Sequence, residues 1–81
     1  MIAYTKHAED KLRRNDIKIF KVSKRKIEQI LKSSRKESKT KYGEYAKVGT
    51  LNKSHDLRIV YDIIDEDIKV ITFHIARKGR Y

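Results

Sequence analysis

The 81-residue chain carries 21 lysines and arginines against 11 acidic residues, a formal net charge of +10, and it contains no cysteine. The lack of cysteine excludes a disulfide-stapled scaffold and fits a reducing, cytoplasmic compartment. No apolar run approaches the roughly 20 residues of a membrane span. We therefore expect one soluble domain, residues 1–81, with one modest core.

The positive charge is concentrated in the first half of the chain. Residues 1–41 hold fourteen basic and five acidic side chains, net +9, whereas residues 42–81 hold seven and six, net +1. Such a field attracts polyanions over a distance, so RNA or the ribosome is the expected partner. A basic surface that serves solubility or thermal stability is the alternative.

The first elements are predicted from capping and periodicity. Ile2 to Tyr4 alternates enough for a short strand. Thr5 is a suitable N-cap for a short charged helix with Ala8 and Leu12 on one side. We expect that helix to stop at Asn15, followed by a connector with apolar anchors at Ile17, Ile19, Phe20 and Val22.

A second helix is predicted after Ser23, an N-cap preceded by Val22 in the position of a hydrophobic staple on Ile27. Ile27, Ile30 and Leu31 form one apolar stripe. The other faces are basic, and the residues assigned to nucleic-acid binding there are Lys24, Arg25, Lys26, Lys32 and Arg35. The Ser-Lys stretch from Lys32 to Lys41 is expected to be a loop.

After this loop the apolar period changes to 2. Tyr42 to Leu51 is a strand candidate in which Gly43 and Gly49 mark bulges or close backbone approach. Lys47 within it is assigned to nucleic-acid binding. Tyr42 suits base stacking, and Tyr45 either stacks on bases or belongs to the core. The most distinct strands are Leu57 to Ile64 and Ile68 to Arg77.

The register of these two strands follows from a three-residue loop at Asp65, Glu66 and Asp67, which sets Ile64 opposite Ile68. One face is then apolar and lies under the helices, with the pairs Leu57–Ile75, Ile59–Phe73 and Tyr61–Ile71. The opposite face carries Arg58–His74, Val60–Thr72 and Asp62–Val70. The end of the last strand adds Arg77, Lys78, Arg80 and Tyr81.

This face unites groups that bind and cleave a phosphodiester. A guanidinium holds phosphate bidentately, an imidazole moves protons near neutral pH, and a tyrosine stacks on a base. Simpler readings remain open: Arg58 can pair with Asp62, and His74 can be a structural histidine. His7 can pack locally, and His55 is expected to be solvated in a loop. Three scattered histidines lack zinc-site spacing, so no metal or cofactor is expected.

The segment from Leu57 to Val70 resembles the paired strands of RelE/ParE-superfamily toxins, where an arginine, hydrophobic residues and a tyrosine lead into an acidic turn. The ending from Phe73 to Tyr81 is similar to the basic, tyrosine-terminated tail of that family. The opening around His7-Ala8 is similar to a neighbouring, RelE-related family whose members begin with a His-Ala helix.

The resemblance implies an α+β fold of order β-α-α-β-β-β, with two N-terminal helices packed on one face of a three- to four-stranded antiparallel sheet. It also implies a metal-independent endoribonuclease that cleaves mRNA, on the ribosome in many members, and an antitoxin protein that covers the open face. Arg58 would then grip the scissile phosphate, Arg77 would stabilise developing charge with help from Lys78 and Arg80, and Tyr81 would act as base or stacking residue. His74 is an acid/base candidate by geometry. Because the superfamily includes inactive members, a noncatalytic RNA- or ribosome-binding module on the same fold is the alternative.

Overall fold

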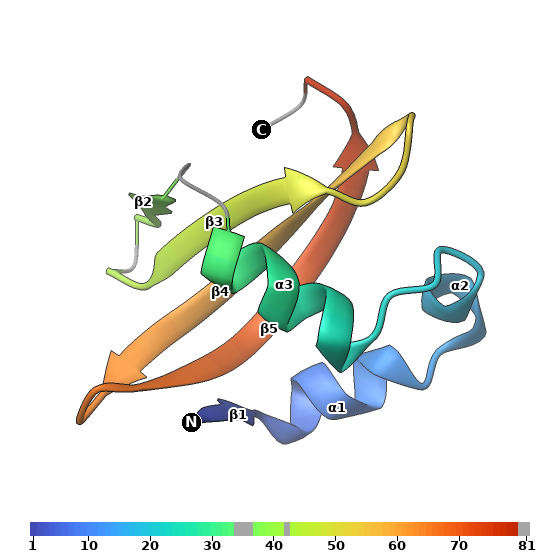
Figure 1. Ribbon diagram of the computed structural model, residues 1–81. Helices are drawn as coiled ribbons and strands as arrows, with labels where there is room; N and C mark the ends of the chain where they lie inside the picture. Colours follow the sequence, from blue (N-terminus) through green and yellow to red (C-terminus); the bar gives the residue numbers. More distant parts are fainter. Residues whose placement is uncertain (34–36, 42, 80–81) are drawn as a thin grey trace.

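The computed structural model describes residues 1–33, 37–41 and 43–79 and forms an α+β fold (Figure 1). Within these residues a five-stranded sheet is combined with three helices. The elements in chain order are β1 (Ile2–Tyr4), α1 (Lys6–Leu12), α2 (Asn15–Lys18), α3 (Lys24–Ser33), β2 (Glu37–Lys39), β3 (Tyr45–Thr50), β4 (His55–Ile64) and β5 (Asp67–Arg77). None of the helices in these ranges is long and apolar enough to cross a bilayer.

The sheet has the strand order β1-β5-β4-β3-β2, and it is mixed because β1 pairs parallel with β5. The expectation of three or four antiparallel strands is therefore wrong. β2 lies in the stretch that was expected to be a loop. The sequence does not indicate this strand, because its three side chains are all exposed and give no alternation. Backbone pairing from Glu37–Lys47 to Lys39–Tyr45 holds it on β3, and the Tyr61 hydroxyl donates to Glu37 at 2.8 Å.

α1 begins at the predicted cap. The Thr5 hydroxyl accepts from the backbone N–H of Ala8 at 3.1 Å and donates to the carbonyl of Ile71 at 2.8 Å, so one side chain caps the helix and ties it to β5. The predicted stop at Asn15 is instead the start of α2, a single turn that buries Ile17. Four residues are too few to show a helical period.

The first two connector residues, Ile17 and Lys18, belong to α2, and the rest of the connector and α3 follow the prediction with one exception. Ile17 and Val22 are buried, but Ile19 is 77% exposed, so its assignment as an anchor is wrong. The Ser23 hydroxyl caps α3 by accepting from the N–H of Lys26 at 3.2 Å. The apolar stripe Ile27, Ile30 and Leu31 is buried as predicted.

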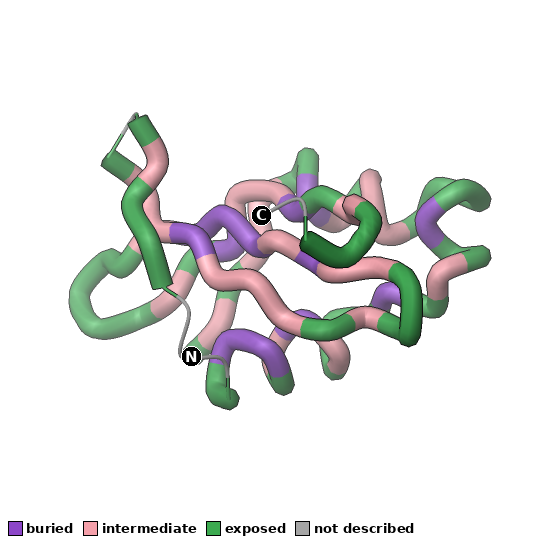
Figure 2. The backbone as a smooth tube through the Cα atoms, turned by 90° about the horizontal axis from the view of Figure 1, so that it is seen from above, coloured by how far each residue is buried: buried purple, intermediate pink, exposed green. Residues whose placement is uncertain are grey.

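α3 crosses one face of the sheet (Figure 1), and its stripe joins a single core cluster with Ala8 of α1 and with Leu57, Ile59 and Phe73. Gly49 of β3 permits the close approach: a Cβ there would lie 2.7 Å from the Ile30 side chain. Buried residues occur in both the sheet and the helices, whereas the turns at the extremities of the molecule are exposed (Figure 2).

The β4–β5 hairpin has a two-residue turn rather than the predicted three-residue loop. Asp65 and Glu66 adopt φ values of 50° and 70°, as a tight hairpin turn requires. A bulge between Val60 and Tyr61 compensates, because Ile71 is an extra residue in β5. The pairs Leu57–Ile75, Arg58–His74, Ile59–Phe73 and Val60–Thr72 are therefore as predicted, whereas the turn end is shifted to Tyr61–Val70, Asp62–Lys69, Ile63–Ile68 and Ile64–Asp67.

Candidate functional site

The sheet face opposite α3, called the open face below, carries the predicted pair of Arg58 on β4 and His74 on β5. The two residues are direct cross-strand partners. An open cavity of about 540 Å³ lies over them, bounded by Lys39, Lys41 and Glu44 from the β2–β3 turn and by Arg58, Thr72 and His74 from the sheet. Three cations and one carboxylate thus line a cavity of a size that small ligands occupy.

Thr72 adds a polar group to this cavity. Its hydroxyl oxygen is buried and has no hydrogen-bond partner in the described part of the chain. A buried hydroxyl without a partner costs roughly 1–3 kcal/mol.

α1 contributes Lys11, which the sequence did not single out. β1 pairs with β5 only from Ile68 to Val70, so the later β5 carbonyls face α1. The Lys11 ammonium donates to the carbonyl of Phe73 and lies 3.5 Å from Nδ1 of His74. The backbone of β5, the strand that carries His74, therefore holds a second cation beside the imidazole.

The surroundings of His74 favour its neutral form. Partial burial lowers the pKa of His74 below its usual 6.5, and the positive charges of Lys11 and Arg58 and the nearby His7 lower it further. An ammonium can only donate, so Nδ1 is assigned as the acceptor and Nε2 carries the ring proton. Burial likewise lowers the pKa of Lys11, with the charge of Arg14 acting in the same direction. At neutral pH the pair is an unprotonated imidazole beside an ammonium.

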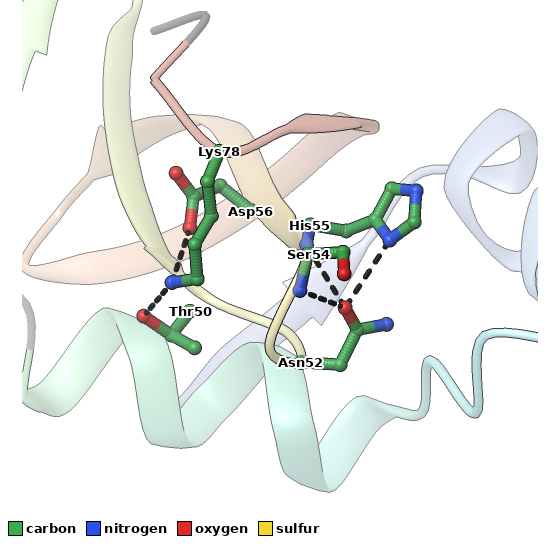
Figure 3. A network of polar contacts seen from close by, with 6 residues as sticks. All are labelled: Thr50, Asn52, Ser54, His55, Asp56 and Lys78. Atoms are coloured by element: carbon green, nitrogen blue, oxygen red, sulfur yellow. Dashed lines mark hydrogen bonds and ion pairs between the residues drawn. The ribbon is translucent and has the colours of Figure 1, made fainter.

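The end of β5 does not gather all its cations on the open face. Lys78 donates to Thr50 at 3.1 Å and lies 3.4 Å from the Asp56 carboxylate, as Figure 3 shows. Arg77 pairs in register with His55, and strand alternation puts it on the face opposite Arg58 and His74. Arg80 and Tyr81, which we assigned to catalysis, lie outside the described residues.

His55 is not the solvated loop residue that the sequence predicted. It begins β4 and is half-buried, because its ring packs edge-on against Phe20 with 4.9 Å between centroids. In Figure 3 the ring points away from Asp56 and Lys78. Asn52 accepts from the His55 backbone N–H at 2.9 Å and lies 3.2 Å from its Nδ1.

The remaining predicted RNA-binding cations lie apart from the Arg58–His74 pair. Lys24 is 2.7 Å from Glu9 and lies over the Tyr4 ring, while Arg25 and Lys32 are exposed on α3. Lys26 is half-buried on the same helix. Lys47 donates to the carbonyl of Leu31 at 2.8 Å, so it caps the C-terminus of α3. Arg35 and the stacking candidate Tyr42 lie outside the described residues, and Tyr45 stacks on Tyr61 beside the core.

Comparison of the chain with protein-family models, with curated proteins and with solved structures finds no match. The described residues hold no group of three or more His, Cys, Asp or Glu side chains that could bind a metal ion. Any assignment of function accordingly depends on the chemistry of the open face.

Proposed function

We propose that the protein is a metal-independent endoribonuclease of the RelE type that binds single-stranded RNA on the open face of its sheet. One observation carries the proposal: Arg58 and His74 are cross-strand partners, and the Lys11 ammonium lies 3.5 Å from Nδ1 of His74. A guanidinium, a neutral imidazole and an ammonium are together the groups needed to hold a phosphodiester and move its protons.

The reaction is an attack of the ribose 2′-hydroxyl on the adjacent phosphorus. The Lys11 ammonium turns from Nδ1 of His74 towards the leaving O5′, which frees Nδ1 to take the 2′-hydroxyl proton. The O2′–P bond forms and the P–O5′ bond breaks. The leaving O5′ takes a proton from the Lys11 ammonium. Arg58 donates to the non-bridging oxygens, whose negative charge grows in the transition state. The products are a 2′,3′-cyclic phosphate and a free 5′-hydroxyl.

The short distance between Lys11 and His74 also allows their starting protonation states to be restored after cleavage. After cleavage His74 is an imidazolium and Lys11 a neutral amine, with 3.5 Å between their nitrogens. The charge of Arg58, which lowers the pKa of His74, favours transfer of that proton to the neutral Lys11. Both groups then return to their starting states.

The resemblance to RelE/ParE toxins supports the same chemistry and adds further roles. It implies stacking or base action for Tyr81, help from Lys78 and Arg80, and an antitoxin as the partner that covers the open face. The charge stabilisation that it implies for Arg77 does not fit this site, because Arg77 lies on the face opposite Arg58 and His74. Cytoplasmic mRNA, free or on the ribosome, is the substrate that this reading implies.

The experiment is incubation of end-labelled mRNA with the purified protein in EDTA, alone and on translating ribosomes. We expect discrete cuts from the wild type, and rates about 10²- to 10⁴-fold lower for His74→Gln and Lys11→Met. Arg58→Gln is expected to impair cleavage as well. Lys53→Met removes the same charge from an exposed loop residue and is expected to cut normally. Intact RNA in both settings would contradict the proposal.

A noncatalytic RNA- or ribosome-binding module is the second candidate. The exposed cations of α3, such as Arg25 and Lys32, favour it, because they can bind phosphates without any acid or base nearby. Its distinguishing result is RNA binding that weakens with salt, without cleavage in either setting.

A further inference from the structure

A second cavity, of about 450 Å³, lies across the β5 edge from the open-face cavity. Its wall contains apolar side chains of Ile17, Phe20 and Ile75. Arg14 and Arg77 also line it. Lys11 and His74 belong to its wall as well, and His74 lines both cavities. The two cavities therefore adjoin at the imidazole.

The aromatic part of this second cavity is held in place. Phe20 packs against the core cluster, and the His55 ring meets it edge-on at 4.9 Å. Asn52 fixes the start of β4 by accepting from the backbone N–H groups of Ser54 and His55, each at 2.9 Å. An aromatic surface fixed before a ligand arrives can stack on it at little entropic cost.

The polar wall of the cavity includes a solvent-exposed ion pair. Arg14 binds Asp16 in a two-point ion pair, with nitrogen–oxygen distances of 3.1 and 2.6 Å. The cations Arg14 and Arg77 and the carboxylate of Asp16 therefore lie around an apolar and aromatic surface. A flat heterocycle that carries hydrogen-bond donors and is attached to a phosphate matches that combination.

We propose that this second cavity binds a nucleobase of the RNA strand, next to the phosphate held at Lys11 and His74. The inference rests on the proposed function, because the shared residues Lys11 and His74 fix where the phosphate lies. An RNA strand that crosses the edge of β5 would place one nucleoside on the open face and the neighbouring nucleoside against Phe20 and His55. The ring pair that the sequence did not predict then has a role in substrate binding.

The test is NMR titration of the protein, labelled with ¹³C in its aromatic rings, with an RNA trinucleotide made uncleavable by 2′-deoxy sugars at its first and second residues. Trinucleotides that lack the first, the second or the third base are titrated in parallel. We expect the His74 ring signals to shift with all four, and the Phe20 and His55 signals to lose their shift when one particular base is absent. Equal shifts of Phe20 and His55 with all four would overturn the nucleobase site while leaving phosphate binding intact. A His74 ring that responds to none would overturn both proposals.

Affinity measurements on variants provide the second readout. Phe20→Leu keeps an apolar side chain for the core, and we expect it to bind the intact trinucleotide about tenfold more weakly. Its affinity for the trinucleotide that lacks the stacked base should equal that of the wild type. Ile19→Ala, at an exposed neighbouring residue outside the cavity, is the control and should bind both normally. Equal losses for Phe20→Leu with both ligands would overturn the inference.

Discussion

The two faces of the β4–β5 hairpin differ in what their residues do, although the residues alternate along the same strands. Leu57, Ile59 and Phe73 are fully buried under the helices. Their neighbours Arg58 and His74 lie on the open face, where they line a cavity with Lys39 and Lys41. Residues that stabilise the fold thus alternate with residues that line the candidate site. Substitutions at adjacent positions should therefore affect stability in one case and activity in the other.

The largest contrast is expected between Phe73→Ala and His74→Ala. Phe73 is fully buried in the core, so its truncation should lower the free energy of unfolding by about 3–5 kcal/mol. His74 is exposed, and its truncation should change stability by less than about 0.5 kcal/mol. Urea denaturation of both variants measures this difference. Equal losses would mean that the two faces are not distinct.

A second prediction concerns the packing of α3 on the sheet. Gly49→Ala would place a methyl group 2.7 Å from two carbons of Ile30, so we expect a loss of about 1–3 kcal/mol. The double variant Gly49→Ala, Ile30→Ala should lose less than the sum of its single variants, because the truncated side chain leaves room. Additive losses in a double-mutant cycle would contradict this contact.

A third prediction concerns the link between α1 and β5. Thr5→Val keeps the shape of the side chain but removes the helix cap and the bond to the Ile71 carbonyl, with an expected cost of about 1–2 kcal/mol. Thr5→Ser retains the hydroxyl and should stay close to the wild type. Thermal unfolding compares the two, and an equal loss in both would show that the hydroxyl contributes nothing.

The smallest expected effect is on the pH dependence of stability. The pKa of His74 is lowered by folding, so between that value and 6.5 the unfolded chain binds more protons. His74 therefore lowers stability as the pH falls through this window, and the effect is small because solvent reaches the ring. His74→Gln should flatten the slope, and Lys11→Met should raise the pKa of His74 towards 6.5 in an NMR titration. A wild-type pKa at or above 6.5 would contradict the described surroundings.

Much of the fold could be predicted from the sequence where a pattern is repeated or capped. Ser23 with the Ile27–Ile30–Leu31 stripe defines α3, and the Ile, Val and Tyr content of Leu57 to Ile64 defines most of β4. α2 and β2 were missed because a four-residue helix and a fully exposed three-residue strand carry no period. The parallel pairing of β1 was also missed, because it joins residues far apart in the chain.

The candidate site was predictable to the same extent. Arg58 was placed opposite His74 by the strand register, and the bulge at Ile71 cancelled the error in turn length. Lys11 was one of 21 basic residues, and its only signal was the four-residue spacing from His7, which puts both on one side of α1. From the sequence, Arg77 was grouped with Arg58. Arg77 is three residues after His74, the partner of Arg58, so strand alternation places the two arginines on opposite faces of the sheet.

The most direct test of the central claim is cleavage of an RNA in EDTA, compared with the same RNA carrying a single 2′-deoxy residue at the principal cut. The proposed chemistry predicts a 2′,3′-cyclic phosphate at that cut in the normal RNA. It also predicts loss of that cut alone in the substituted RNA. A cut that persists at the 2′-deoxy residue, or RNA that stays intact with the wild-type protein, would contradict the account.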